Sequence, residues 1–141
     1  MHRLLLPLAV IVAAVGIVLV VSGTAHGTTT DRASERVAYA AIREVFGAGR
    51  LADCMMRVAG RETGWTFDAR AANWTDRHSD GSRGSFGLFQ IGAIHRAGGE
   101  TVAHFARRMF RVGANVRAAF QLYHRSGLRP WGGWCLSLIH I

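Results

Sequence analysis

The sequence predicts a mainly α-helical domain with a small irregular or β lobe in its middle. Apolar residues recur at helical spacing through most of residues 33–135. Residues 65–85 break this pattern, because they are rich in Asn, Asp, Ser and Gly, which are typical of turns and loops. A chain of 141 residues is long enough for one such domain. Half of the chain is apolar and 18% is charged, which excludes a disordered protein.

The first 25 residues predict a signal peptide or a membrane anchor. Arg3 supplies a positive charge, residues 4–21 are almost unbroken hydrocarbon, and small residues precede a cleavage point after Ala25. An apolar run of about 18 residues is also the lower limit for a membrane span, so anchoring through residues 4–21 stays open. Both alternatives predict export, to the extracellular space or the cell envelope. Residues 26–32 are expected to form a polar linker.

The charge balance predicts an anionic partner. All 17 basic residues are arginine, and only nine acidic residues oppose them, which gives a net charge of +8. Arginine without lysine also follows from GC-rich coding, so charge alone does not choose among nucleic acid, a membrane surface and an acidic polysaccharide. Export argues against nucleic acid as the partner.

The two cysteines predict a disulfide. Cys54 and Cys135 form an even pair in an exported small domain, and their spacing is unlike that of a C-x-x-C redox or metal motif. In the chain-entropy model, a bridge that closes so long a loop stabilises the fold by on the order of 4 kcal/mol.

Two helices are expected before the irregular lobe. Ser34 is expected to cap a helix over residues 35–46, which ends at Gly47. A second helix is expected over residues 51–63, and Gly64 ends it. The expected inward residues are Val37, Ala41, Val45 and Phe46 in the first helix, and Leu51, Met55 and Val58, with Cys54 alongside, in the second.

After the lobe, the short apolar segment 86–91 predicts a strand or a buried turn, and helices are expected over residues 101–110 and 112–126. The expected inward residues are Val102, Phe105 and Met109 in the first of these helices, and Val112, Val116, Ala119, Phe120 and Tyr123 in the second. Residues 130–134 are expected to pack their indoles across a cleft or the core. Residues 136–141 differ in composition from the rest, and their codons can be written as the end of a sequencing adapter, so they are expected to be a non-native scar.

One acidic residue breaks its local pattern. Glu62 continues the apolar stripe of Leu51, Met55 and Val58 at helical spacing, where an apolar residue is expected. It also falls in the last turn of its helix, where the helix dipole disfavours a carboxylate. Burial and the helix end both raise the pKa of such a group, and a general acid must hold its proton near neutral pH. The alternative is a glutamate at a frayed helix end, turned to water.

Several motifs around Glu62 carry a family resemblance. They are R-E-T-G at 61–64, A-A-N at 71–73, G-S-F-G-L-F-Q-I at 84–91 and P-W-G-G-W-C at 130–135. Together they resemble the lysozyme-like superfamily over about residues 38–135, especially the SLT-type lytic transglycosylases of bacteria and the goose-type lysozymes. The resemblance implies a lysozyme-like α+β domain that cleaves peptidoglycan glycan strands between N-acetylmuramic acid and N-acetylglucosamine.

The resemblance implies that Glu62 is the catalytic acid. Glycosidases usually pair two carboxylates, but Ser85 stands where chicken-type lysozymes carry an aspartate before the aromatic-Gly pair. A lytic transglycosylase needs only the glutamate, because the muramic sugar's own hydroxyl attacks and an anhydro-sugar is released. The sequence therefore favours a transglycosylase.

Two alternatives stay open. Asp80 lies near the position of a candidate base in goose-type enzymes, so a hydrolase with Asp80 assisting water is one, and Asp76 is a less favoured substitute for Asp80. The other is a non-catalytic module that binds the cell wall. By resemblance, Ser85, Gln90 and Tyr123 contact the substrate or Glu62, although Tyr123 also fits the apolar stripe of its helix.

Metal and thiol chemistry are weaker interpretations. His78, Asp80 and His95 are candidates for a zinc set, but the sequence has no H-E-x-x-H motif and no metal-type cysteine spacing. A bridged Cys54 would have no free thiolate to act as a nucleophile. We therefore expect no metal and no cofactor, with peptidoglycan strands as the partner of a monomer.

Overall fold

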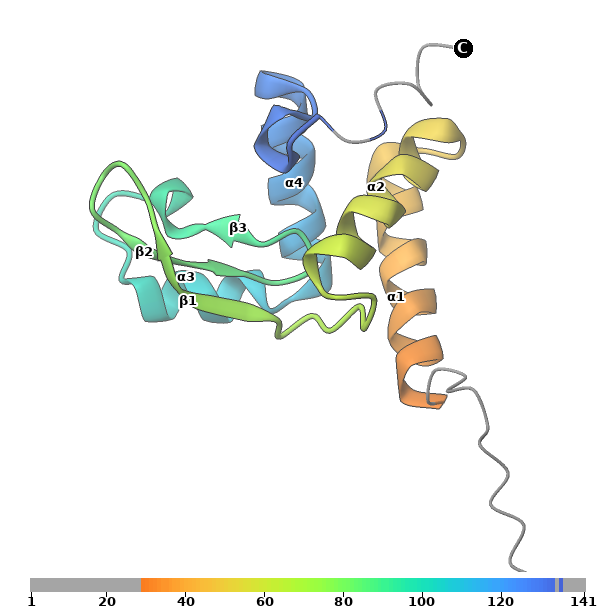
Figure 1. Ribbon diagram of the computed structural model, residues 1–141, viewed down its shortest axis with the longest axis horizontal. Helices are drawn as coiled ribbons and strands as arrows, with labels where there is room; N and C mark the ends of the chain where they lie inside the picture. Colours follow the sequence, from red (N-terminus) through yellow and green to blue (C-terminus); the bar gives the residue numbers. More distant parts are fainter. Residues whose placement is uncertain (1–28, 134, 136–141) are drawn as a thin grey trace, which may run out of the picture.

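The computed structural model describes residues 29–133 and Cys135, and it shows an α+β domain (Figure 1). The sheet and α3 lie on one side of α4, and α1 and α2 lie on the other. The predicted leader or anchor over residues 1–25 and the predicted scar over residues 136–141 lie outside the described residues. The elements in chain order are α1 (Thr29–Phe46), α2 (Arg50–Glu62), β1 (Ala72–Arg77), β2 (Arg83–Phe86), β3 (Ile91–Gly92), η1 (Ala93–His95), α3 (Val102–Met109), α4 (Val112–Ser126) and η2 (Arg129–Trp131).

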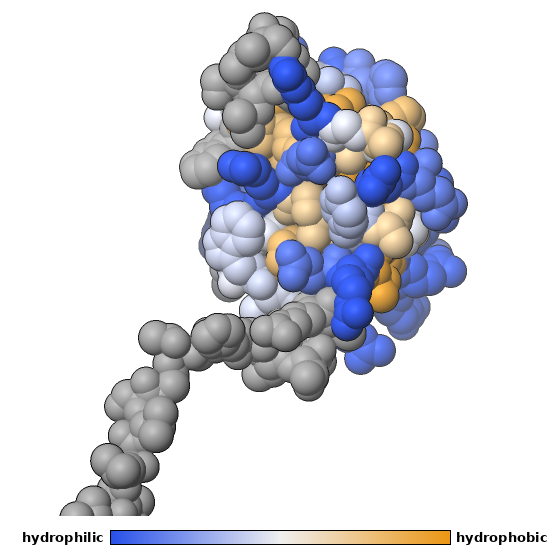
Figure 2. All heavy atoms as spheres, turned by 90° about the vertical axis from the view of Figure 1, so that its right-hand side faces the viewer, coloured by the Kyte–Doolittle hydropathy of each residue, from blue (hydrophilic) through white to orange (hydrophobic). Residues whose placement is uncertain are grey.

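The first helix is longer than predicted, and three of its expected inward residues, Ala41, Val45 and Phe46, pack against the core as predicted. It begins at Thr29, so Ser34 lies inside the helix and the expected linker is helical at its end. Ala38 and Ile42 are buried at i, i+4 spacing, whereas Val37 is 55% exposed, so its expected inward position is wrong. One residue along a helix is a rotation of about 100°, which is enough to move Val37 out of the core. Figure 2, which faces the α1 and α2 side, shows apolar side chains there among hydrophilic ones.

The second helix confirms its predicted stripe. Met55, Val58 and Cys54 are buried, and Leu51 is half-buried. The helix ends at Glu62, one residue before the predicted end. Gly64 has a φ of 61° and ends the helix as predicted, since its amide donates to the Arg61 carbonyl at 3.2 Å and the Trp65 amide donates to the Gly60 carbonyl at 2.6 Å. The Thr63 hydroxyl donates to the Ala59 carbonyl at 2.8 Å. That carbonyl also accepts the Thr63 amide, at 3.1 Å. Thr63 thus closes the last turn and leaves Glu62 at its end.

A three-stranded antiparallel sheet occupies the lobe, in the order β1-β2-β3. β1 pairs Ala72 with Phe86 of β2, and β2 pairs Ser85 with Gly92 of β3. β1 lies inside the region expected to be irregular. It carries no apolar alternation that the sequence could reveal, because nearly all of its residues are exposed.

In the predicted apolar segment 86–91, Phe86 ends β2, residues 87–90 form a turn, and Ile91 begins β3. Asn115 of α4 holds this turn in place. The Asn115 amide nitrogen donates to the Phe86 carbonyl at 2.9 Å, and its oxygen accepts the Phe89 amide at 2.9 Å. Asn115 is 0% exposed, so these bonds form without competition from water. Gly87 sits directly against Asn115 with a φ of 78°, so a side chain there would meet the amide group.

The late helices and the tail complete the core largely as expected. Phe105, Met109, Val116 and Ala119 are buried, as predicted. Trp131 is 5% exposed, and its indole nitrogen donates to the Phe89 carbonyl at 3.0 Å, so it fixes the far side of the same turn. None of the helices within residues 29–133 is long and apolar enough to cross a membrane.

The two cysteines lie together, as the disulfide prediction requires, but the structure holds them as separate thiols. The Cys135 thiol donates to the Cys54 carbonyl at 3.5 Å. Burial and the neighbouring Cys135 raise the pKa of the Cys54 thiol to about 12. The disulfide is therefore not present in the structure, although the chain brings residues 54 and 135 into contact.

Replacing Asn115 with alanine is expected to destabilise the fold. Asn115→Ala leaves the Phe86 carbonyl and the Phe89 amide buried without their partner, which costs about 2–6 kcal/mol at about 1–3 kcal/mol for each group. Urea unfolding followed by circular dichroism measures the change in the free energy of unfolding. Gln121→Ala, on an exposed position of the same helix, is the control and is expected to change it by less than about 0.5 kcal/mol. Equal losses in the two variants would contradict the role given to Asn115.

Candidate active site

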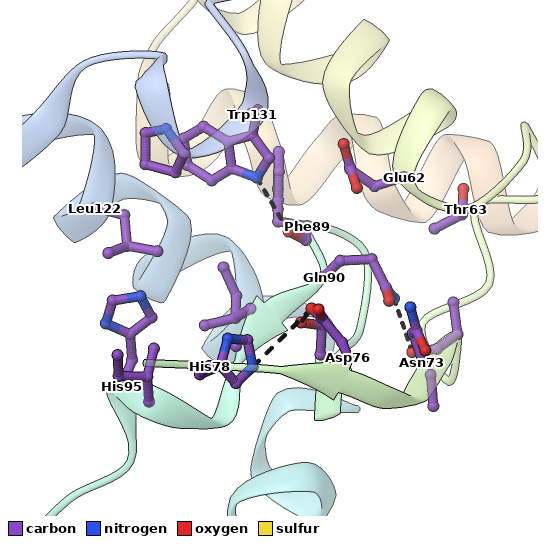
Figure 3. A pocket seen from close by; sticks show the side chains of 17 residues that line it. Glu62, Thr63, Asn73, Asp76, His78, Phe89, Gln90, His95, Leu122 and Trp131 are labelled. Atoms are coloured by element: carbon purple, nitrogen blue, oxygen red, sulfur yellow. Dashed lines mark hydrogen bonds and ion pairs between the residues drawn. The ribbon is translucent and has the colours of Figure 1, made fainter. Parts of the chain in front are cut away.

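A cavity of about 730 Å³ opens where the helical part of the domain meets the sheet. Its walls come from the end of α2, from β1, from the turn that Asn115 holds, and from α4 and η2 (Figure 3). The polar and charged lining residues are Glu62, Thr63, Asn73, Asp76, His78, Ser85, Gln90 and His95. The apolar side includes Phe89, Ile91, Ile94, Leu122, Pro130 and Trp131.

Glu62 is half-buried and points into this cavity from the last turn of α2. Burial raises the pKa of its carboxyl, and the positive charge of Arg61 opposes part of that rise. Its place at the carboxyl end of the helix acts in the same direction as burial, since the helix dipole disfavours negative charge there. A carboxyl group held this way keeps its proton to higher pH than an exposed glutamate.

A second carboxylate, that of Asp76, also lines the cavity and lies on β1. The hydroxyl of Ser85, on the neighbouring strand β2, donates to its Oδ2. The Nε2 of His78 lies 4.0 Å from the same oxygen and 3.0 Å from the Gly84 carbonyl. Because a carbonyl only accepts, His78 donates to it through a protonated Nε2. Ser85 is 5% exposed, so it holds Asp76 from a buried position.

The structure does not bring Asp80 into the cavity. Asp80 is exposed in the turn between β1 and β2, where it accepts the Ser82 amide at 2.9 Å and the Ser82 hydroxyl at 2.6 Å. Arg96 also pairs with it at 3.2 Å. The bonds from Ser82, aided by Arg96, lower the pKa of the Asp80 carboxyl. The geometry is that of a turn-forming aspartate.

Of the expected substrate-binding residues, Ser85 and Gln90 line the cavity and Tyr123 does not. The Gln90 amide nitrogen donates to the carbonyls of Ala71 at 3.1 Å and Gly87 at 3.0 Å, which leaves its oxygen as an acceptor. The Tyr123 ring instead lies 6.1 Å from the ring of Phe46, on the core side of α4. Tyr123 therefore packs against the core, and it does not contact the cavity as the resemblance implied.

The histidines of the weaker zinc interpretation line the cavity, but they do not form a metal site. Within residues 29–133 and Cys135, no group of three His, Cys, Asp or Glu side chains is placed to hold a metal ion. His95 is exposed, and its pKa is lowered, first because neighbouring atoms partly shield the ring from water and second because of the positive charge of Arg125. Both effects keep its imidazole neutral near pH 7, so His95 offers hydrogen bonds to a ligand and not a fixed charge.

The sequence pattern singled out Glu62 and placed Trp131 at a cleft or the core, but it undervalued Asp76 and missed Leu122 as a lining residue. Asp76 shows no signal in the sequence beyond its place before a turn, because its contact with Ser85 depends on the register of β1 and β2. The site combines a carboxyl group of raised pKa, that of Glu62, with a second carboxyl group, that of Asp76, in one open cavity, and such a pair suits acid–base chemistry on a polar substrate. No family model, curated protein or solved structure matches the chain.

Proposed function

We propose that this protein cleaves the glycan strands of peptidoglycan between N-acetylmuramic acid and N-acetylglucosamine, with Glu62 as the general acid. The observation that carries the proposal is the half-buried Glu62 carboxyl, which has a raised pKa and faces an open cavity. The motifs that resemble lysozyme-like enzymes give the substrate class, and several of their residues, including Glu62, Ser85 and Gln90, line this cavity. Ile94, which is 37% exposed, supplies apolar surface on which the face of a sugar ring can rest.

The preferred route is that of a lytic transglycosylase. Glu62 gives its proton to the glycosidic oxygen, the bond from that oxygen to the anomeric carbon breaks, and positive charge develops on the muramic sugar. A hydroxyl of the same sugar then attacks the anomeric carbon and gives its proton back to the Glu62 carboxylate. The product is an anhydro-sugar, and one carboxyl group serves as acid and then as base.

Asp76 favours a second route, hydrolysis. A carboxylate in the same cavity as Glu62 is the partner that a hydrolase needs to activate water or to stabilise the sugar cation. Asp76, held by Ser85, fits that role better than Asp80, which is tied to Ser82 and Arg96 outside the cavity. The two routes differ by one water molecule in the product.

Replacing Glu62 with glutamine tests the proposed activity. Glu62→Gln keeps the shape of the side chain but removes the proton donor, so cleavage of purified cell-wall sacculi is expected to fall about 10²–10⁴-fold. Turbidity loss measures the rate, and mass spectrometry of the products separates anhydro-sugars from reducing ends. Equal clearing by the two proteins would reject Glu62 as the general acid, and binding of sacculi without cleavage by either would favour a wall-binding module.

Asp76→Asn, compared with Asp80→Asn, separates the two routes. If the enzyme hydrolyses its substrate, loss of the Asp76 charge is expected to lower the rate of cleavage by at least about 10²-fold, since a general base contributes about that much. A transglycosylase is expected to keep most of its activity in this variant. Asp80→Asn is the matched control and is expected to leave the rate unchanged, because Asp80 lies outside the cavity. Rates are measured on sacculi, together with product masses.

The raised pKa of Glu62 predicts a dependence of stability on pH. Folding favours the protonated carboxyl, so wild-type protein loses stability as the pH rises from the unfolded value of about 4.5 through the higher folded value. Glu62→Gln carries no charge and avoids this loss. The variant is therefore expected to be more stable than wild type at pH 7, and the difference is expected to vanish below pH 4. Thermal unfolding from pH 3 to 8 measures it, with Glu44→Gln on the exposed face of α1 as control.

A further inference from the structure

The last part of the chain carries positive charge without any opposing acid. Residues 101–135 contain six arginines and no aspartate or glutamate. All nine acidic residues of the chain lie at or before Glu100. The proposed cleavage of glycan strands uses none of these six arginines, so their concentration on α3, α4 and η2 calls for a separate explanation.

Three of these arginines line a second cavity, of about 470 Å³, where α3 ends and α4 begins. Arg108, Arg111 and Arg117 supply the charge, and the other lining residues are Gly113, Ala114, Ala118 and Gln121. This cavity shares no lining residue with the one that contains Glu62. It is therefore a distinct, positively charged hollow with small neutral walls.

Arg108 is fixed in this hollow by the nearest acid, Glu100. Its Nε and Nη2 donate to the two carboxylate oxygens at 3.1 and 2.7 Å. Only 8% of the Glu100 side chain is exposed, and the bonds from Arg108 lead the causes that lower the pKa of Glu100 to about 2. His104 contacts the same carboxylate at 2.9 Å. Arg108 already balances the negative charge of Glu100. Glu100 therefore does not neutralise the positive charge of the other arginines in the hollow.

Arg111 and Arg117 have no acidic partner among the described residues. The guanidinium of Arg117 folds back along α4 over Gly113, where an added Cβ would lie 3.3 Å from its Nη1. The absence of a side chain at Gly113 therefore makes room for the Arg117 guanidinium on this surface. The first turn of α4 contains no acid and no side-chain cap, so the helix end adds to the positive potential.

We propose that this hollow binds the phosphate groups of an extended anionic polymer. A guanidinium presents paired N–H donors that match two phosphate oxygens, and this pairing is stronger than contact with a neutral group. None of the lining residues is aromatic, so the hollow offers no platform for stacked nucleic-acid bases. None is a large apolar residue either, so it offers nothing to insert into a bilayer.

The arginine surface continues along α4 beyond the hollow, which favours a polymer over a single phosphate ion. Arg117, Gln121 and Arg125 follow one another at i, i+4 spacing and so share one face of the helix. At about 1.5 Å of rise for each residue, this face spans about 12 Å. A chain with repeated phosphates can contact both ends of such a face. The proposal does not depend on the activity of the cavity that contains Glu62.

Binding of long-chain inorganic polyphosphate to the purified full chain tests the proposal. The double variant Arg111→Gln/Arg117→Gln is expected to bind it at least about tenfold more weakly at physiological salt, and the slope of log K against log salt is expected to fall by about 1 to 2. The control Arg70→Gln/Arg83→Gln loses the same charge from exposed positions outside both cavities and is expected to change affinity less than about threefold. Fluorescence anisotropy measures both quantities, and unchanged melting temperatures show that the variants fold.

Three other outcomes would overturn the proposal. Equal weakening in both double variants would mean general attraction by net charge and no site. Equal affinity for polyglutamate of matched charge would mean that phosphate is not recognised. Tighter binding to phosphatidylglycerol vesicles than to polyphosphate would assign the surface to a membrane.

The variant Arg111→Lys/Arg117→Lys keeps the charge but loses the paired donors, so it is expected to bind polyphosphate more weakly than wild type and more tightly than the glutamine variant.

Discussion

The side-chain amide of Asn115 is the contact on which the rest of the domain depends. A buried turn has backbone groups that no strand or helix partner satisfies, and Asn115 supplies both a donor and an acceptor to the turn between β2 and β3. Trp131 satisfies one more carbonyl of the same turn from the opposite side. Sheet, α4 and tail are therefore tied together at one place, although their residues are far apart in the chain.

The hydrogen bonds from Asn115 and Trp131 to the turn determine the shape of the cavity. Phe89 and Gln90 belong to the turn and line the cavity floor, and Ser85 precedes the turn on β2. The position of Ser85 in turn places Asp76, through a hydrogen bond between adjacent strands. Glu62 enters from a different element, and its burial depends on α2 packing against α1 and the core. Glu62 and Asp76 are thus held in place by different parts of the fold.

The sequence predicted those features that arise from one element and missed those that arise between elements. Glu62 stood out because it broke a helical stripe, and the structure places it in a cavity as that pattern indicated. The strand β1 was missed because its residues are polar and exposed, so its existence depends on pairing with β2 and not on its own composition. Asp80 was preferred over Asp76 because it lies near the position of a candidate base in goose-type enzymes, and the sequence does not show that Ser82 ties Asp80 into a turn. The inward position of Val37 was wrong because the buried face of α1 contains Ala38 and Ile42, and Val37 lies about 100° from Ala38 around the helix.

The two carboxylates of the cavity are joined by a single connection, residues 63–71, between the end of α2 and the start of β1. This connection contains no regular element, and it leaves the exposed indole of Trp65 on the surface. Phe67 within it is buried in the core, and the Ala71 carbonyl accepts the Gly87 amide at 2.8 Å, so insertions or deletions fit only at its exposed residues, 64–66, 68 and 70. Loops tolerate such insertions and deletions better than helices or strands do. The exposed residues of this connection can therefore vary in number while Glu62 and Asp76 keep their places.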